Sequence, residues 1–446
     1  MLDLLTTLIC CLLPGEPPTA ITGARLIDGT GAAPRDGCTV LVRGDRIAAV
    51  GPGVVVPEDA VVVDGRGMTL LPGMFDTHGH CFTVDGKAQY EAYPLLFLAG
   101  GVTTVFSPGE MDPAAAYALR DRLARGEQDG ARLLTAGPYF EQGDSGFAWM
   151  RGYRDGDEAL AWLAEHAARM DGLKLSMQVT AAEAAAIVRE AHRHGLRVTG
   201  HLGRVTAAEA IELGIDRLEH GLFAMSEFAP WQVEGLDAWA AKFERIGALD
   251  LDSEPVQRLI DQIVARRVAL SATTVSFAEW RPGFAPVTPD WERYLAPSIR
   301  RLEAARHLRM ATLPPEQGRK FAAGVQKQLE FLKRVHDRGG IVVTGSDPGG
   351  KQLIPGYGLH RELQLLVEAG FTPLAALRAA TQHAAMALGV DREFGTIEAG
   401  KVADLVLVAG DPAQDIAAVG ATRSVWKAGR RHDPAALRRA AEGRIR

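Results

Sequence analysis

The sequence predicts an α/β fold, a (β/α)8 TIM-type barrel, and two observations carry this prediction. Between residues 73 and 389, short apolar runs alternate with Ala-rich amphipathic segments, which is typical of parallel βαβ units. Eight apolar runs can be counted there: GMFDTHGH, VTTVFSPG, ARLLTAG, GLKLSM, LRVTGHL, DRLEHG, VALSAT and IVVTGSD. Because helical segments follow most of these runs, we expect eight strands whose carboxyl ends form the active-site face.

Both ends of the chain have a different sequence pattern, which is typical of a small antiparallel sheet. Residues 20–72 form short β-rich runs broken by Gly, Pro and Asp, and residues 390–430 repeat the pattern in GTIEAGKVADLVLVAGDP and TRSVWKAGRR. We therefore expect a split β-domain from these two segments and a barrel domain over 73–389. The C-terminal tail, 431–446, is expected to be a solvated helix or a frayed end.

Two helices of the barrel region can be located by their first turns. Thr180 precedes Glu183 by three residues, and Thr206 precedes Glu209 by three residues. Each pair matches a capping box, so helices are predicted to begin at Thr180 and at Thr206.

Two insertions interrupt the barrel pattern, at about 226–262 and 277–328. They carry four of the seven tryptophans, namely Trp231, Trp239, Trp280 and Trp291. The insertions could cover the barrel mouth as a lid or pack as extra helices on the outside, and the sequence favours neither alternative.

Composition and charge narrow the function class. The 446 residues carry a formal net charge of -6, which argues against the basic face of a nucleic-acid-binding protein. The four cysteines, Cys10, Cys11, Cys38 and Cys81, are too few for a disulfide framework in a chain of this length. We expect a small-molecule ligand, and a homo-oligomer is allowed but not required.

The first segment, residues 1–19, is an apolar run of signal-peptide length followed by prolines. No Lys or Arg precedes the run, Asp3 lies where positive charge belongs, and no clear cleavage site follows. The run is too short to span a membrane. A secretory signal and a disordered N-terminus both remain open, and the missing basic residues favour a cytoplasmic location slightly.

Six residues that can bind a metal or act as a base fall at the carboxyl ends of the predicted strands. They are His78 and His80 on the first strand, Lys174 in the fourth, His201 after the fifth, His220 after the sixth and Asp347 after the eighth. Singly, each has an ordinary explanation, such as a turn for Asp347 or a solvent-directed side chain for Lys174. Together at one rim of one barrel, they predict a metal centre.

The residue types suit two divalent cations. Imidazole and carboxylate ligands are those preferred by Zn²⁺ and similar ions, and two such ions about 3.5–4 Å apart can share a hydroxide and polarise a carbonyl. A protonated lysine would be a poor bridge between two cations. We therefore expect Lys174 to be carboxylated to N6-carboxylysine, whose carbamate has two anionic oxygens.

These motifs resemble the amidohydrolase superfamily, and within it the imidazolonepropionase-related group that includes Xaa-Pro-type dipeptidases. The resemblance runs from LLPGMFDTHGH through AGGVTTVFSPG, AHRHGLRVTGH, GIDRLEHG and VVTGSDPGG to LHRELQLLVEAGFTPLAALRAAT and LGVDREFGTIEAGKVADLVLVAGDP. It implies that the split β-domain is a β-sandwich formed from both chain ends. Imidazolonepropionase itself resembles a one-metal enzyme without the lysine, so Lys174 favours a binuclear, peptidase-like member.

The resemblance also implies roles for the six residues. His78, His80 and Asp347 resemble the ligands of the first metal, His201 and His220 those of the second, and Lys174 the bridging group. The implied reaction is attack of a metal-bridging hydroxide on the amide or peptide C–N bond of a small molecule, such as a dipeptide or an N-acyl amino acid. Asp347 would take the proton and deliver it to the leaving amine.

Two other functions stay open: a phosphoester or lactone hydrolase on the same binuclear centre, and a non-catalytic relative that keeps the barrel. The presence of every expected ligand argues against the second. Tyr139, Tyr357 and His360 are candidate substrate contacts, because they follow the third and eighth strands. Asp76, one alternation before His78, is expected to lie deeper in the barrel as structural support rather than as a ligand.

Overall fold

The computed structural model describes residues 17–83, 86–143, 151–230, 235–285, 287–288, 290–348 and 353–446. The predicted signal or disordered segment, 1–19, lies outside these residues except for its last three, and Trp231 also lies outside them. Within the part of the chain that is described, no helix is long and apolar enough to span a membrane.

The eight predicted barrel strands are present. They pair in parallel in chain order within two sets, the first three strands and the last five. They are β6 (Met74–Asp76), β7 (Val102–Ser107), β8 (Arg132–Thr135), β11 (Leu173–Leu175), β12 (Val198–Gly200), β13 (Arg217–Leu218), β14 (Ala269–Ser271) and β15 (Ile341–Val343). Backbone hydrogen bonds close the ring: Thr77 N–H donates to Thr344 O at 2.9 Å, and Asp171 N–H donates to Thr135 O at 2.8 Å. The barrel prediction is confirmed.

Two short strands were not predicted. β9 (Phe140–Gln142) pairs in parallel with β10 (Arg151–Tyr153) and meets β11 where Phe140 lies opposite Leu175. Because Leu175 is the last residue of β11, these strands extend the sheet from the carboxyl rim. They form where the chain has no run of alternating apolar residues.

Helices connect the strands and cover the barrel. They are α1 (Tyr93–Ala99), α2 (Pro113–Arg125), α3 (Gly156–His166), α4 (Ala181–Arg193), α5 (Ala207–Leu213), α6 (Gly235–Gly247), α7 (Glu254–Ala265), α8 (Thr274–Ala278), α9 (Pro297–Ala311), α10 (Pro315–Asp337), α11 (Tyr357–Glu368), α12 (Pro373–Ala379), α13 (Gln382–Leu388) and α14 (Pro434–Ala441), with 3-10 turns η1 (Ala167–Arg169), η2 (Gly221–Ala224), η3 (Trp291–Tyr294) and η4 (Ile416–Gly420). Both predicted capping boxes are formed, Thr180 with Glu183 at α4 and Thr206 with Glu209 at α5.

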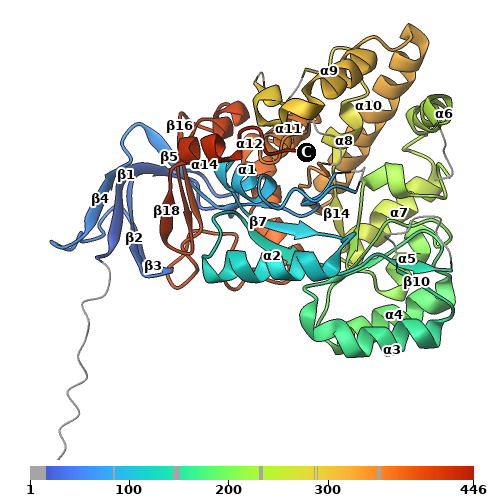
Figure 1. Ribbon diagram of the computed structural model, residues 1–446, viewed down its shortest axis with the longest axis horizontal. Coiled ribbons are helices and arrows are strands. Elements are labelled where there is room, and N and C mark those ends of the chain that lie inside the picture. Colours follow the sequence, from blue (N-terminus) through green and yellow to red (C-terminus); the bar gives the residue numbers. More distant parts are fainter. Residues whose placement is uncertain are drawn as a thin grey trace, which may run out of the picture.

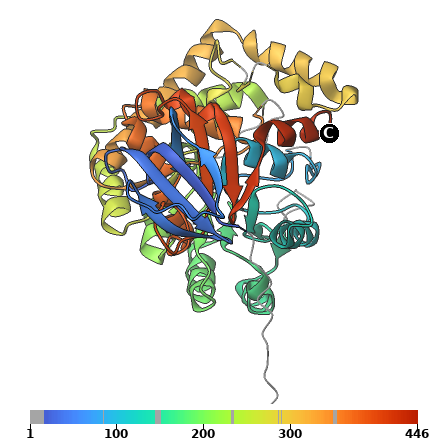
Figure 2. The same ribbon diagram turned by 90° about the vertical axis from the view of Figure 1, so that its left-hand side faces the viewer.

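A separate sheet is built from both chain ends, as expected. Its strands are β1 (Thr19–Leu26), β2 (Arg35–Arg43), β3 (Arg46–Gly51), β4 (Val61–Asp64), β5 (Met68–Pro72), β16 (Leu405–Ala409), β17 (Thr422–Lys427) and β18 (Arg430–His432). Antiparallel pairing of β5 with β16 joins the two halves, and Figure 2 shows the N-terminal and C-terminal strands side by side. The sheet has its own core, to which Ile21, Val40 and Trp426 contribute.

The two insertions divide between the rim and the barrel wall. Figure 1 shows α6, α9 and α10 at the end of the molecule opposite β1–β4. Trp239 of α6 stacks with Trp280 after α8 at 6.1 Å between ring centroids, and Phe277 of α8 contacts the ring of His220 at 5.8 Å. In contrast, α7 packs against α5, and α10 reaches β15. The insertions therefore supply both an aromatic wall at the rim and ordinary barrel helices.

The prediction of a solvated or frayed C-terminal tail was wrong. Helix α14 packs against α1, and Leu437, Ala441 and Ile445 are buried. Ile445 N–H donates to Tyr294 O at 2.9 Å, and Ala296 N–H donates to Ile445 O at 2.7 Å. The tail is ordered because its small apolar face is covered by the barrel and by the second insertion.

Candidate metal centre

His78 and His80 follow β6 at the carboxyl rim, and their rings meet edge to face with centroids 5.2 Å apart. The Nδ1 atom of His78 lies 2.7 Å from Glu219 Oε2, and that of His80 lies 3.2 Å from Ser107 Oγ. An imidazole that carries its proton on Nδ1 offers the Nε2 lone pair to a ligand. Both Nε2 atoms face Asp347 Oδ1, at 3.9 Å from His78 and 3.7 Å from His80.

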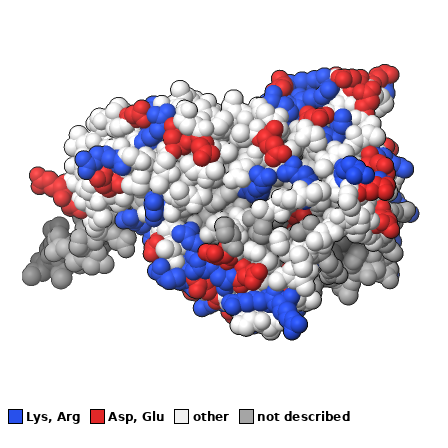
Figure 3. Space-filling model, turned by 90° about the horizontal axis from the view of Figure 1, so that it is seen from above, with Lys and Arg blue, Asp and Glu red and all other residues white. Residues whose placement is uncertain are grey.

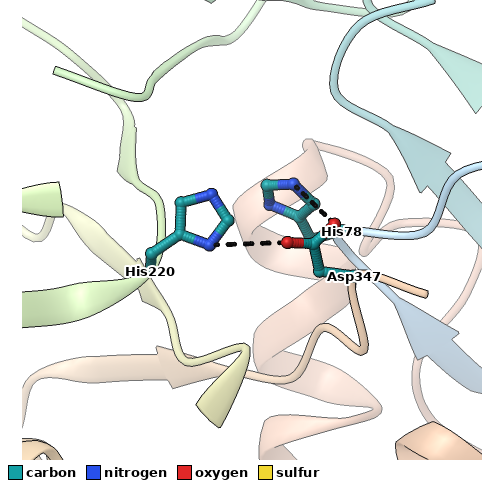
Figure 4. Close-up of side chains that lie close together, drawn as sticks. All are labelled: His78, His220 and Asp347. Atoms are coloured by element: carbon teal, nitrogen blue, oxygen red, sulfur yellow. Dashed lines mark ion pairs between the residues drawn. The ribbon is translucent and has the colours of Figure 1, made fainter. Parts of the chain in front are cut away.

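Asp347 lies in the loop after β15, where its φ of 44° is a left-handed conformation that aspartate tolerates. Its N–H donates to His78 O at 2.7 Å, so the loop is bound to the end of β6. The Oδ2 atom lies 3.9 Å from His220 Nδ1, and Figure 4 shows the ion pairs that join the carboxylate to the rings of His78 and His220. Candidate ligand atoms of His78, His220 and Asp347 all lie within 4.8 Å of one another.

His220 and His201 complete the histidine cluster. The His220 backbone is also left-handed, with φ 61°, and its Nδ1 lies 2.8 Å from Thr273 Oγ1 at the end of β14. The His201 ring lies 4.8 Å from the His220 ring, and the His78 ring lies 4.5 Å from it. Three barrel strands thus place these imidazoles around one point.

Lys174 projects from β11 toward the same point. Its Nζ lies 5.2 Å from the centre of the Tyr139 ring, and the Tyr139 ring lies 6.5 Å from that of His80. The charge of Lys174 acts on Asp347 and on each of the four histidines. The structure therefore brings all six predicted ligands, and Tyr139, to one rim.

Burial controls the protonation of the histidines. It lowers the pKa of His78, His80 and His201 well below the usual value and that of His220 to about 3. All four rings are therefore neutral at pH 7, which is the form that binds a metal.

The pKa values of Lys174 and Asp347 both shift in the direction that favours the uncharged side chain. Burial lowers the pKa of Lys174, and burial raises the pKa of Asp347 to about 7. A quarter of the Asp347 side chain is exposed, whereas those of His78, His80 and His220 are nearly covered. Asp347 is thus more open to a water molecule than these three rings.

The donor set fits divalent cations. Neutral imidazoles and a carboxylate are the groups that Zn²⁺ prefers, and they are gathered here. His78 Nε2 and Asp347 Oδ1, 3.9 Å apart, are too distant to form a hydrogen bond with each other. A bound cation would bring Asp347 back to its anionic form. Burial lowers the pKa of Lys174 and so favours the neutral amine, which is the form that reacts with CO₂ to give a carbamate. The chemistry of the residues is therefore compatible with the expected binuclear centre.

Sequence reasoning missed Glu219, the residue before His220. Its carboxylate is fully buried and accepts from Arg217 Nε at 2.8 Å and from the hydroxyl of Thr199 on one oxygen, while His78 lies on the other. Burial raises its pKa, but Arg217 and His78 outweigh burial and hold the pKa well below the usual range. An Arg and a Glu two residues apart in a buried strand were the available signal.

Asp76 has the supporting position that was expected. It is fully buried, and its carboxylate accepts from the N–H of His78 at 3.2 Å, from the N–H of Ser346 at 3.0 Å and from the Ser346 hydroxyl. Asp76 thereby binds the loop that carries Asp347 to the end of β6.

Tyr357 and His360 do not join the metal cluster in the structure. They lie on the first turn of α11 and line a separate cavity of about 550 Å³. His360 donates from Nε2 to Gly100 O at 2.7 Å, and burial lowers its pKa to about 4, so its ring is neutral.

Comparison with known proteins places the chain in a family. A model of the amidohydrolase family matches residues 69–431, which include the barrel, the candidate metal ligands and the part of the small sheet formed by β5, β16 and β17. The chain belongs to the amidohydrolase family. This agrees with the resemblance carried by the sequence motifs.

Individual relatives of this amidohydrolase are more distant. It is 26% identical to the imidazolonepropionase of Deinococcus radiodurans over 404 residues, which cover 85% of this chain and 87% of that enzyme. It is 39% identical to the N-acyl-D-aspartate deacylase of Alcaligenes xylosoxydans xylosoxydans over 92 residues, 21% of this chain, and the match spans only 18% of that protein. A Xaa-Pro dipeptidase structure with bound methionine has the same fold, with a TM-score of 0.67 at 22% identity, over 93% of this chain and all of that one.

Proposed function

We propose that this amidohydrolase uses two divalent cations, expected to be Zn²⁺, to hydrolyse the C–N bond of a dipeptide or an N-acyl amino acid. The observation that carries the proposal is the gathering of His78, His80 and His220 around Asp347 at the carboxyl rim. The names of the relatives, a deacylase and a dipeptidase among them, support the same reaction class.

Each residue has a proposed part in holding the cations. His78, His80 and Asp347 would bind one cation, His201 and His220 the other, and Lys174, as a carbamate, both. Two bound cations supply positive charge that polarises a carbonyl and makes a water molecule acidic.

Asp347 moves the proton. Its carboxylate is held at the rim through its own N–H on His78 O, and its partial exposure leaves room for a water molecule beside it. The carboxylate accepts the proton of the attacking water and delivers it to the nitrogen of the leaving amine, which departs as a neutral amine.

The first experiment is a screen of dipeptides and N-acyl amino acids with Zn²⁺-loaded protein. We expect hydrolysis of at least one of these substrates and its loss on chelation. Activity confined to lactones or phosphoesters would replace the proposal by the other reaction that such a centre supports, and binding of no metal after Zn²⁺ addition would contradict it.

Two substitutions test the assigned roles. Asp347→Asn should abolish turnover while leaving metal content largely intact, because the amide still occupies the site but is not a base. Lys174→Ala should instead lower the metal content, measured by elemental analysis of the purified protein, and a small carboxylic acid added to it should restore part of the binding. Full activity of Asp347→Asn would rule out its role as the base.

A further inference from the structure

Thr273 lies just after β14 and immediately before α8, and it has no part in the proposed chemistry. Its side chain is fully buried, and its φ of 43° is a left-handed conformation that a β-branched residue rarely adopts. Five non-glycine residues of the described chain have a positive φ, and three of them, His220, Thr273 and Asp347, lie at the carboxyl rim. Strained backbone of this kind persists only where the surrounding structure imposes it, and it gathers at functional sites.

Two helices impose the backbone conformation of Thr273. On one side, the buried carboxylate of Glu362 on α11 accepts from the N–H groups of Thr274 and Val275 at 3.0 and 2.6 Å. On the other side, Gln328 Nε2 of α10 donates at 3.4 Å to the carbonyl oxygen of the residue before Thr273. The backbone is therefore held on both sides of the strained residue.

The side chain of Thr273 is oriented by its methyl group. A Cβ atom at Gly345 would lie 3.0 Å from Thr273 Cγ2, so this methyl group packs directly on the Gly345 backbone. Because a β-branched side chain is stiff about χ1, fixing the methyl group also fixes the hydroxyl. The hydroxyl oxygen lies 2.8 Å from His220 Nδ1.

This contact decides which nitrogen of His220 is open to a ligand. A neutral imidazole carries its proton on one nitrogen, and only the other nitrogen can donate a lone pair to a metal. Thr273 Oγ1 is close enough to accept a proton from Nδ1, whereas Asp347 Oδ2, at 3.9 Å, is too distant. With the proton on Nδ1, the Nε2 lone pair of His220 is free.

We propose that Thr273 is a positioning residue for His220. Its hydroxyl accepts the Nδ1 proton and so directs the Nε2 lone pair to a divalent cation, and Glu362 holds Thr273 in the conformation that this contact requires. The cation rests on the proposed function, whereas the orientation of the ring rests on the contacts of Thr273.

The tautomer of His220 can be measured in the metal-free protein. Long-range ¹H–¹⁵N NMR of histidine-labelled protein distinguishes a proton on Nδ1 from a proton on Nε2, and His220→Gln identifies the signal. We expect the proton on Nδ1 in the unmodified protein and a mixture of tautomers in Thr273→Val, which keeps the branched shape without the hydroxyl. A proton on Nε2 in the unmodified protein, or an unchanged tautomer in Thr273→Val, would overturn the proposal.

Metal binding gives a second measurement. Metal-free protein is titrated with Co²⁺, and visible absorption together with competition by a chelator gives the affinity of each ion. Thr273→Val should weaken one ion about 10- to 100-fold, the usual effect of losing the partner of a ligating imidazole, and change the other by less than about threefold. Equal weakening of both ions would indicate a general structural role and would refute the positioning role.

Two further variants separate the hydroxyl from the fold. Thr273→Ser keeps the hydroxyl and should retain both the tautomer and the metal affinity. Thr103→Val is the matched control, because Thr103 is fully buried in β7 and its hydroxyl has no hydrogen-bond partner among the described residues. This control should change neither measurement. An equal loss in Thr273→Ser and Thr273→Val would assign the effect to packing and overturn the proposal.

Glu362→Gln tests the backbone support and remains informative if Thr273→Val does not fold. Glu362 uses one oxygen for each N–H group, and glutamine offers a single acceptor oxygen. The variant should weaken the same ion, by less than Thr273→Val, and an unchanged affinity would overturn the part assigned to Glu362. A preserved Nδ1 tautomer in a protein that binds no metal would contradict the proposed function alone, whereas two tightly bound ions in Thr273→Val would contradict the positioning role alone.

Discussion

Glu219 determines how His78 is presented at the rim. Its Oε2 lies 2.7 Å from His78 Nδ1, and Arg217 and Thr199 hold its other oxygen. A carboxylate at Nδ1 fixes the imidazole tautomer and its orientation, so the Nε2 lone pair points to Asp347. The buried carboxylate of Glu219, after β13, thus orients the ring of His78, which follows β6.

Replacing Glu219 by Gln should therefore weaken metal binding by about 10- to 100-fold, the usual effect of losing such a partner. Competition with a chromophoric chelator measures this affinity. Glu212→Gln is the matched control, because Glu212 is an exposed acid of α5 that pairs with Arg266 at 2.9 Å. Equal metal affinity in the Glu219 variant and the control would contradict the orienting role.

At the scale of elements, helix α10 is bound to the rim by one side chain. Gln328 is fully buried; its Oε1 accepts from Leu222 N–H at 2.8 Å, and its Nε2 donates to His220 O at 3.2 Å and to Ala272 O at 3.4 Å. These bonds satisfy backbone groups just after β13 and β14, next to the candidate metal site. The long helix of the second insertion therefore stabilises the loops that carry His220.

Gln328→Leu keeps the volume of the side chain but leaves buried backbone groups without partners. We expect a loss of about 2–3 kcal/mol in the free energy of unfolding, measured by urea denaturation. Gln326→Leu on the exposed face of α10 is the control and should change stability little. A similar small change for both variants would show that water or backbone movement replaces the lost bonds.

At the scale of the whole molecule, a partly buried ion pair joins the small sheet to the barrel. Arg132 of β8 donates to Asp404 Oδ2 at 2.7 Å, and Asp404, just before β16, also accepts from Ala428 N–H at 2.7 Å. The Arg132 guanidinium lies 4.2 Å from the centre of the Phe394 ring. Only 5% of the Asp404 side chain is exposed, so these partners take the place of water around its carboxylate.

Asp404→Ala should leave Arg132 without a carboxylate partner, with only its bond to the Thr104 hydroxyl, and should leave the N–H of Ala428 unpaired at this interface. We expect the free energy of unfolding to fall by about 2–3 kcal/mol, less than for a fully buried pair because Arg132 is partly exposed. Asp36→Ala, which removes an exposed partner of Arg25, should have no measurable effect. Thermal unfolding that separates into two transitions would indicate that this pair couples the sheet to the barrel.

The surface carries charges of both signs. On the face in Figure 3, basic and acidic side chains are interspersed over the barrel and the small sheet. This agrees with the modest net charge of -6, and it means that no single sign of electrostatic potential covers that face.

The sequence alone predicted the eight barrel strands, the two capping boxes and the position of the six candidate ligands at one rim, because these depend on local periodicity and on strand ends that must share one rim. His78 and His80 could be assigned to one face from their spacing in a strand. The sequence did not predict β9 and β10, which form by pairing at the rim. Nor did it predict the packing of the C-terminal tail, where Ile445 is buried and hydrogen-bonds to Tyr294.

Only the tertiary structure decided which side chains act on one another across the barrel. Glu219 reaches His78 over 141 positions of sequence, and Asp76 reaches Ser346 over 270. Arg281 and Arg361 face one cavity because α8 and α11 are bound together through Glu362. The candidate metal ligands were visible in the sequence because they lie in or just after predicted strands, whereas the partners that orient them are brought into contact only when distant strands and helices pack.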